Sequence, residues 1–338
     1  MSSVSVFVGL DYHEDSIRIC VVTPEGRELF NKDAPNSVAI VAERILNLGW
    51  PIVVAIEACC GSADFAAELQ ARTGWSVKLA DPAAVMAMKR GRDKTDRGDA
   101  FWLADLARVG HLPEVWQPDS VTRQLRRLVR YRQQMAHQRR ELKQQLRSVL
   151  RDERAHDAPA NSWTKKWREW LLKEAKLGVH ARFVVEQQIK RLDQIEKDIQ
   201  EVEQRLELAT VNDPFTQALL RYDGIGLITA VTLRAELGTV DRFRHGKQLS
   251  RYCGTTPCNR SSGRRQADAG LVRQANHELR TVVIEAAHRL VRWDPKWKTL
   301  KQHLINQGKP RSVATAAVAN RWLRWLFPQL KAALSPAA

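Results

Sequence analysis

The stretch from Lys94 to Ala100 carries two carboxylates, Asp96 and Asp99, three residues apart. The apolar residues that follow predict a helix, in which positions i and i+3 lie on one face, so both carboxylates can point at a common spot. Lysines and arginines surround them. Convergent carboxylates among cations predict a divalent-metal site beside a phosphate-binding surface. Taken alone, the pair is more simply explained as acids that complement a helix dipole, so the rest of the chain decides.

The N-terminal hundred residues alternate between strand and helix patterns. Apolar or alternating runs predict strands, and amphipathic runs predict helices between them, in the order β-β-β-α-β-α-β. The strands are expected at 4–10, 16–22, 27–30, 52–56 and 76–80, and the helices at 38–48 and 64–72. Acids at strand ends in this order are typical of the ribonuclease H-like fold, an α/β class.

Two further acids end strands of that predicted sheet. Asp11 follows the first strand and Glu57 the fourth, and ligands gather outside strand ends in α/β sheets. With Asp96 and Asp99 arriving from a helix across the sheet, four acids can hold two Mg²⁺ ions about 4 Å apart. Glu57 can alternatively be an ordinary surface acid at the end of a strand, with no role in metal binding.

Composition identifies the class of partner. The 338 residues carry a net charge of +16 and a pI of about 10.0, which favours a polyanionic partner, either nucleic acid or an acidic membrane surface. No apolar run of membrane-spanning length and no signal peptide is found. We therefore expect a cytoplasmic protein that binds nucleic acid and no membrane. Five cysteines without a metal-type pattern are expected to be reduced.

After Asp119 the pattern changes to a long heptad seam. Seam positions recur at alternating spacings of four and three over 121–149 and are apolar except for Arg132 and Arg139, and a second apolar stripe spans 185–206. These predict a coiled-coil hairpin, or pairing with another subunit. The tryptophans between the stripes are expected to pack at the hairpin tip, with stacking on unpaired bases as the alternative. The first helix is strongly one-signed, which predicts a nucleic-acid-binding face over a merely solvated one. Its candidate contacts are Arg123, Arg126, Arg127, Arg130, Arg139, Arg140, Lys143 and Arg147.

The C-terminal part, from residue 212, holds two further candidate sites. Gly224 and Gly226 lie in a predicted turn between helices, whose free N–H groups can bind a DNA phosphate, although an ordinary helix–helix turn explains the spacing equally well. An irregular loop over 254–265 is rich in hydroxyls and includes Arg264 and Arg265. A serine there is a turn residue, or a nucleophile if it meets the metal site, with the arginines stabilising phosphoryl charge.

These motifs together resemble the insertion-sequence 110 and 1111 family of transposases. The resemblance rests on Gly9-Leu10-Asp11, Glu57-Ala58, Asp81-Pro82, the stretch 94–100, Gly224-Ile225-Gly226, Gly254-Thr255-Thr256-Pro257 and Ser262-Gly263. It implies a RuvC-like domain over 1–117, a basic coiled-coil hairpin over 118–211 and a helical transposase domain over 212–338. It further implies a dimer, tetrameric in the synaptic complex, that recombines donor and target DNA under guidance of a non-coding bridge RNA. The protein would associate with the nucleoid when active.

The resemblance also assigns roles to individual residues. Asp11, Glu57, Asp96 and Asp99 are implied as Mg²⁺ ligands, and Ser262 as the nucleophile that forms a covalent 5′-phosphoserine. The adjacent Ser261 keeps that last assignment open by one position, and the chain departs from common family patterns at Glu14 and at the Cys59-Cys60 pair. One alternative is a metal-dependent Holliday-junction resolvase-like nuclease that hydrolyses DNA with water. Another is a non-catalytic nucleic-acid-binding protein with a degenerate core.

Overall fold

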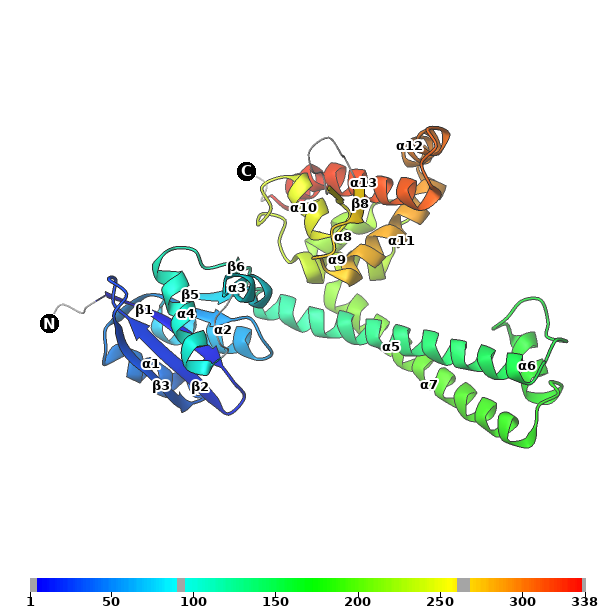
Figure 1. The fold of residues 1–338 in the computed structure, drawn as a ribbon. Coiled ribbons are helices and arrows are strands. Elements are labelled where there is room, and N and C mark those ends of the chain that lie inside the picture. The colour runs from blue at the N-terminus through cyan, green and yellow to red at the C-terminus, as the bar shows by residue number, and fades with distance from the viewer. Residues whose placement is uncertain (1–4, 90–94, 260–267, 336–338) are drawn as a thin grey trace. The chain divides into compact units, whose positions relative to one another are not determined.

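The computed structural model describes residues 5–89, 95–259 and 268–335. The chain forms two compact units, Met1–Pro118 and Asp119–Ala338, which are described separately (Figure 1). Several predicted site residues, namely Ser261, Ser262, Arg264 and Arg265, lie outside the described residues. Within the described ranges, no helix combines the length and apolarity that a membrane span requires.

The first unit is built on a six-stranded sheet in the order β3-β2-β1-β4-β5-β6. Strands β1 to β3 are successively antiparallel, β4 runs parallel to both β1 and β5, and β6 is antiparallel to β5. This mixed architecture is consistent with the expected ribonuclease H-like domain, and β6 is a strand that the sequence did not predict. The strands are β1 (Ser5–Tyr12), β2 (Ser16–Val22), β3 (Glu28–Pro35), β4 (Trp50–Glu57), β5 (Val77–Ala80) and β6 (Glu114–Val115).

Helices cover both faces of this sheet. Side chains alternate along β1, so Val6, Val8 and Leu10 pack with α1 (Val38–Leu46) and α2 (Ser62–Thr73) in one core. The opposite face is covered by α3 (Pro82–Met88) and α4 (Asp96–Arg108). A Cβ on Gly9 would stand 2.0 Å from the backbone oxygen of Ala100, so glycine at this position lets α4 lie directly on the sheet.

The second unit contains two long antiparallel helices, α5 (Ser120–Asp152) and α7 (Val179–Thr210). Leu146 and Leu192 lie in one apolar cluster between them, near the tip helix α6 (Lys165–Lys173). The tryptophans Trp167 and Trp170 of α6 are buried in that cluster, which agrees with packing at the tip. The strict heptad seam is not followed at its start. Val121 is 69% exposed, because the buried stripe there turns toward α9.

The remaining helices of this unit enclose a separate core around the fully buried Trp322. They are α8 (Pro214–Leu220), α9 (Leu227–Leu237), α10 (Gly246–Tyr252), α11 (His277–Trp293), α12 (Pro295–Asn306) and α13 (Arg311–Leu334). Within the loop predicted over 254–265, β7 (Pro257–Asn259) forms a strand that pairs antiparallel with β8 (Asp268–Leu271). The prediction of an irregular loop was therefore wrong over 257–259.

Candidate functional site

Strand geometry places Asp11 and Glu57 on the face of the sheet that α4 covers. Asp11 is two residues after Gly9, on which α4 lies, and alternate residues of a strand share a face. Glu57 follows Ala55, whose side chain packs with α4 on the same face of β4. The parallel register of β1 and β4 brings Asp11 and Glu57 to neighbouring strand ends. Both acids therefore face the helix that carries the other two.

The first turn of α4 supplies Asp96 and Asp99. Thr95 caps this helix, its Oγ1 accepting a hydrogen bond from the N–H of Gly98 at 3.2 Å. Asp99 is buried and Asp96 is exposed, so the two carboxylates lie in different surroundings. The ammonium of Lys89 forms an ion pair with Asp99. A cation thus already stands beside one of the four predicted acids.

A histidine that sequence reasoning missed joins this group. Nε2 of His13 lies 3.3 Å from Oδ2 of Asp11. One ligand atom from each of Asp11, His13 and Asp96 lies within 4.8 Å of the other two. Within the described residues this compact group includes neither Glu57 nor Asp99. The position of His13, two residues after Asp11 at a strand end, was the signal that could have identified it.

The electrostatics of Asp11 favour a cation. Burial raises the pKa of Asp11 above its usual value, and the nearby carboxylate of Asp96 raises it further, while His13 and Lys89 lower it. A half-buried carboxylate that faces a second carboxylate is stabilised by positive charge between them. Carboxylate oxygens and an imidazole nitrogen are also ligands that divalent metals accept. The donor set therefore fits a divalent cation.

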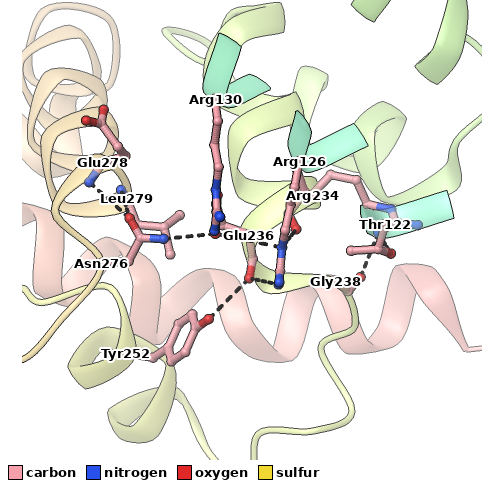
Figure 2. Close-up of polar contacts among 11 residues, drawn as sticks. Thr122, Arg126, Arg130, Arg234, Glu236, Gly238, Tyr252, Asn276, Glu278 and Leu279 are labelled. Atoms are coloured by element: carbon pink, nitrogen blue, oxygen red, sulfur yellow. Dashed lines mark hydrogen bonds and ion pairs between the residues drawn. The ribbon is translucent and has the colours of Figure 1, made fainter. Parts of the chain in front are cut away.

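Some of the arginine side chains of the basic helix α5 form hydrogen bonds within the second unit. Arg130 donates from Nε and Nη2 to the two carboxylate oxygens of Glu236, at 2.9 and 3.1 Å. Arg126 donates to the backbone oxygens of Ala235 and Glu236, at 2.7 and 2.9 Å, at the end of α9 (Figure 2). The side chain of Glu236 is only 2% exposed. These two arginines, predicted to bind nucleic acid, thus hold α9 against α5.

Further polar contacts extend this cluster. Asn276 donates to Glu236 at 2.9 Å and also caps α11 by accepting from its first N–H groups (Figure 2). Arg234 bonds to Asp213 at 2.8 Å and to the hydroxyl of Thr122 at 3.1 Å. The start of α5, the end of α9 and the start of α11 are therefore connected through buried or half-buried polar groups.

The second half of α5 presents its cations differently. Lys143 lies 3.5 Å from Glu196 of α7, and both Lys143 and Arg147 stack over the ring of Trp163. Arg140 is exposed, and Arg139 is half-buried. Neither has an ion pair within the part of the chain that the structure describes. Of the other candidates, Arg123 is half-buried and Arg127 is exposed.

The glycine turn borders a cleft of about 840 Å³ between α5, α7, α9 and α11. Gly224 has a φ of +82°, and its carbonyl oxygen accepts from Nε of Arg289 at 2.8 Å. Gly226 is exposed and caps α9 without a side-chain bond, which leaves the first N–H groups of the helix available. The charged cleft residues are balanced, three arginines against three glutamates: Arg132, Arg140, Arg289, Glu203, Glu278 and Glu285. The cleft wall itself therefore adds little attraction for phosphate.

Two sequence models of transposases match the chain. A model of DEDD-type IS110 elements, described as "Transposase", matches residues 8–153. A second, described as "Transposase IS116/IS110/IS902 family", matches residues 216–302. The first matched range contains the four predicted acids, and the second contains the glycine turn at Gly224 and Gly226.

Individual relatives point the same way. The transposase for insertion sequence element IS1111A of Coxiella burnetii is 23% identical over 328 residues, covering 94% of this chain and 88% of the relative. A "Probable family 20 transposase" of Pseudomonas aeruginosa is 28% identical over 292 residues, 83% of this chain and 84% of the relative. The protein y4qE of Sinorhizobium fredii, provisionally named a transposase, is 32% identical over 206 residues, which cover 61% of this chain but only half of that relative (50%).

Proposed function

Because this chain belongs to the IS110/IS1111 family of transposases, we propose that it is a DNA recombinase that cuts and rejoins donor and target DNA. The observation that carries the proposal is the arrangement of acids at one sheet edge. Asp11 and Glu57 end neighbouring strands on the face that α4 covers, and Asp96 comes from the first turn of α4. Such an arrangement is suited to hold Mg²⁺, which when bound polarises a scissile phosphate.

The proposed ligands are Asp11, Glu57, Asp96 and Asp99, with two ions as the expected number. Asp11 and Asp96 are close enough to share an ion, whereas Asp99 is paired with Lys89 and has to exchange that partner. The protein's own part is to hold carboxylates at fixed positions: burial restrains Asp11, and the Thr95 cap fixes the turn that carries Asp96.

Ser262 is the proposed nucleophile. Its Oγ attacks the phosphorus of the scissile diester, the bond to the leaving 3′ oxygen breaks, and that oxygen takes up a proton as the serine loses one. The 5′-phosphate stays on the serine until a 3′-OH of the partner DNA attacks it and the serine regains its proton. Arg264 and Arg265 are proposed to stabilise the phosphoryl charge. The four proposed metal ligands belong to the first unit and Ser262 to the second. We therefore also propose that the acids and the serine meet in an assembled dimer or tetramer.

We also propose three functional regions, over 1–117, 118–211 and 212–338. The first is a RuvC-like catalytic domain, the second a basic coiled-coil hairpin and the third a transposase domain. Bridge RNA and DNA are proposed to lie along the cations of α5 that face outward, and a DNA phosphate at Gly224 and Gly226. Because a bound RNA can supply sequence specificity by base pairing, the protein needs to contact backbone and shape only.

A direct test of RNA guidance uses the protein expressed with its native flanking DNA and purified at moderate salt. Sequencing of the bound RNA is expected to give one discrete species that maps beside the gene and is complementary to donor and target. Scattered cellular RNA would instead indicate non-specific binding by the +16 charge.

The serine is tested with those substrates. Ser262→Ala is expected to abolish the covalent protein–DNA adduct and strand exchange, while the matched control Ser261→Ala keeps both. Loss of the adduct in Ser261→Ala alone would move the nucleophile by one position.

The second candidate function is a junction resolvase that hydrolyses DNA with water. It is favoured by one observation: all four proposed metal ligands, Asp11, Glu57, Asp96 and Asp99, belong to the first unit. Cleavage of four-way junctions that continues unchanged in Ser262→Ala, and stops in Asp11→Asn, would support this function over recombination.

A further inference from the structure

His13 is held in place at the edge of the acid cluster. Its backbone N–H donates to the carbonyl of Ser16 at 2.9 Å, and its carbonyl accepts from Nδ2 of Asn36 at 2.9 Å. Its side chain is 49% exposed, so packing does not dictate its direction. With both backbone groups bonded, the backbone of His13 is fixed beside Asp11, and the half-exposed imidazole lies against that carboxylate.

The distances around His13 match those between ligands of one metal ion. Neighbouring ligands of an ion with bonds of 2.0–2.2 Å stand about 3 Å apart, and opposite ligands a little over 4 Å apart. Nε2 of His13 is 3.3 Å from Oδ2 of Asp11. The ligand atoms of Asp11, His13 and Asp96 all fall within 4.8 Å of one another. One ion can therefore contact all three with small side-chain adjustments.

The chemistry of the imidazole distinguishes it from the four acids. It adds a neutral nitrogen donor to a site that already has two carboxylates facing each other. Nitrogen donors strengthen the binding of first-row transition-metal ions, whereas Mg²⁺ prefers oxygen. A site with one imidazole should thus discriminate between these ions.

From this geometry we propose that His13 is a direct ligand of the divalent cation at Asp11 and Asp96, and that it makes the site favour Mn²⁺-type ions over Mg²⁺. This inference rests on the metal site of the proposed function. It adds a residue that the four-acid set does not contain. A histidine that only orients Asp11 through a hydrogen bond would instead affect all divalent ions alike.

The test uses full-length protein with Mn²⁺ as the probe and pulsed electron paramagnetic resonance as the readout. A bound imidazole gives a characteristic ¹⁴N coupling to Mn²⁺. We expect this coupling in the wild type and its loss in His13→Gln, which keeps an amide donor for Asp11. His111→Gln is the matched control, since His111 is the other histidine of the first unit and is also exposed.

Affinity measurements complete the test. We expect His13→Gln to weaken Mn²⁺ binding by about tenfold or more and Mg²⁺ binding by less than about threefold, with Mg²⁺ measured by competition. Mn²⁺ bound to the wild type without nitrogen coupling, or equal losses for both ions, would overturn the inference and leave the recombinase proposal intact. Mn²⁺ binding that survives Asp11→Asn, or that is absent from the wild type, would overturn the acidic centre itself.

Discussion

Substitutions of Arg130 and Arg140, both on α5, can distinguish an arginine that stabilises the fold from one that is available to bind nucleic acid. Both were predicted from the sequence to contact nucleic acid. In the structure, Arg130 makes two hydrogen bonds to the carboxylate of Glu236, while Arg140 is exposed and has no ion pair within the described residues. We predict that Arg130→Ala destabilises the second unit and that Arg140→Ala does not.

The expected loss of unfolding free energy in Arg130→Ala follows from how deeply Arg130 and Glu236 are each buried. Removing one partner of a buried ion pair typically costs about 3–5 kcal/mol, because the other charge stays buried. Glu236 is 2% exposed, but the Arg130 side chain is 57% exposed, and Asn276 and Arg126 remain beside the carboxylate. Solvent screening and these remaining partners reduce the loss to roughly 2–3 kcal/mol. For a unit of this size that lowers the melting temperature by roughly 4–12 °C.

Differential scanning calorimetry of the full-length variants measures the stability, and binding titrations at several salt concentrations measure the nucleic-acid contact. Arg140→Ala is expected to keep the wild-type melting temperature and to lower the salt dependence of binding by about one phosphate contact. A wild-type melting temperature for Arg130→Ala, together with such a reduced salt dependence, would refute the assignment of Arg130 to the fold.

Three further predictions concern other parts of the chain. Asp119 caps α5, and its backbone contacts lower its pKa below the usual 3.8, so its stabilisation is present above about pH 4 and lost as the pH falls through the folded-state pKa. Asp119→Ala should therefore cost about 1 kcal/mol in denaturant titrations at pH 7 and progressively less toward pH 3. Lys89→Gln removes the cation that pairs with Asp99 and should tighten Mn²⁺ binding roughly fivefold by calorimetry, about the effect of one unit charge 4 Å away in water; weaker binding would contradict competition between lysine and metal. Burial raises the pKa of the Cys253 thiol to about 12, so iodoacetamide at pH 8 should modify the exposed Cys60 and leave Cys253 unmodified until the protein is denatured, as mass spectrometry can show.

Much of the first unit was predictable because its strands are short apolar runs with clear ends. The sequence order of the first five strands, and the positions of Asp11 and Glu57 near strand ends, follow from side-chain periodicity. In the dipeptide Asp81-Pro82, the Asp81 side chain accepts a hydrogen bond from the N–H of Ala84 and caps α3, and the proline lies in the first turn of that helix. The dipeptide is thus a helix start signal that sequence analysis underused. The two-residue β6 is too short to leave a pattern.

The surroundings of individual charges could not be predicted in the same way. Arg130 and Glu236 are separated by 106 positions in sequence, and nothing local to either residue indicates the other. His13 does not belong to the pattern of carboxylates at strand ends, and its approach to Asp11 depends on a turn closed by Ser16. Such pairings depend on tertiary structure, which a propensity-based reading does not contain.

The positively charged side chains of α5 have different surroundings along the helix. In the first half, Arg126 and Arg130 bond to α9, and Arg132 bonds to Glu203 of α7 at 2.6 and 2.9 Å, inside the predicted heptad seam. A polar pair within an apolar seam favours one register of the two helices over shifted ones, since any shift leaves both charges without a partner. In the second half, Arg139 and Arg140 have no such internal partner among the described residues. Net charge identifies α5 as a basic helix, but the structure shows that Arg126, Arg130 and Arg132 also bond to neighbouring helices of the same unit.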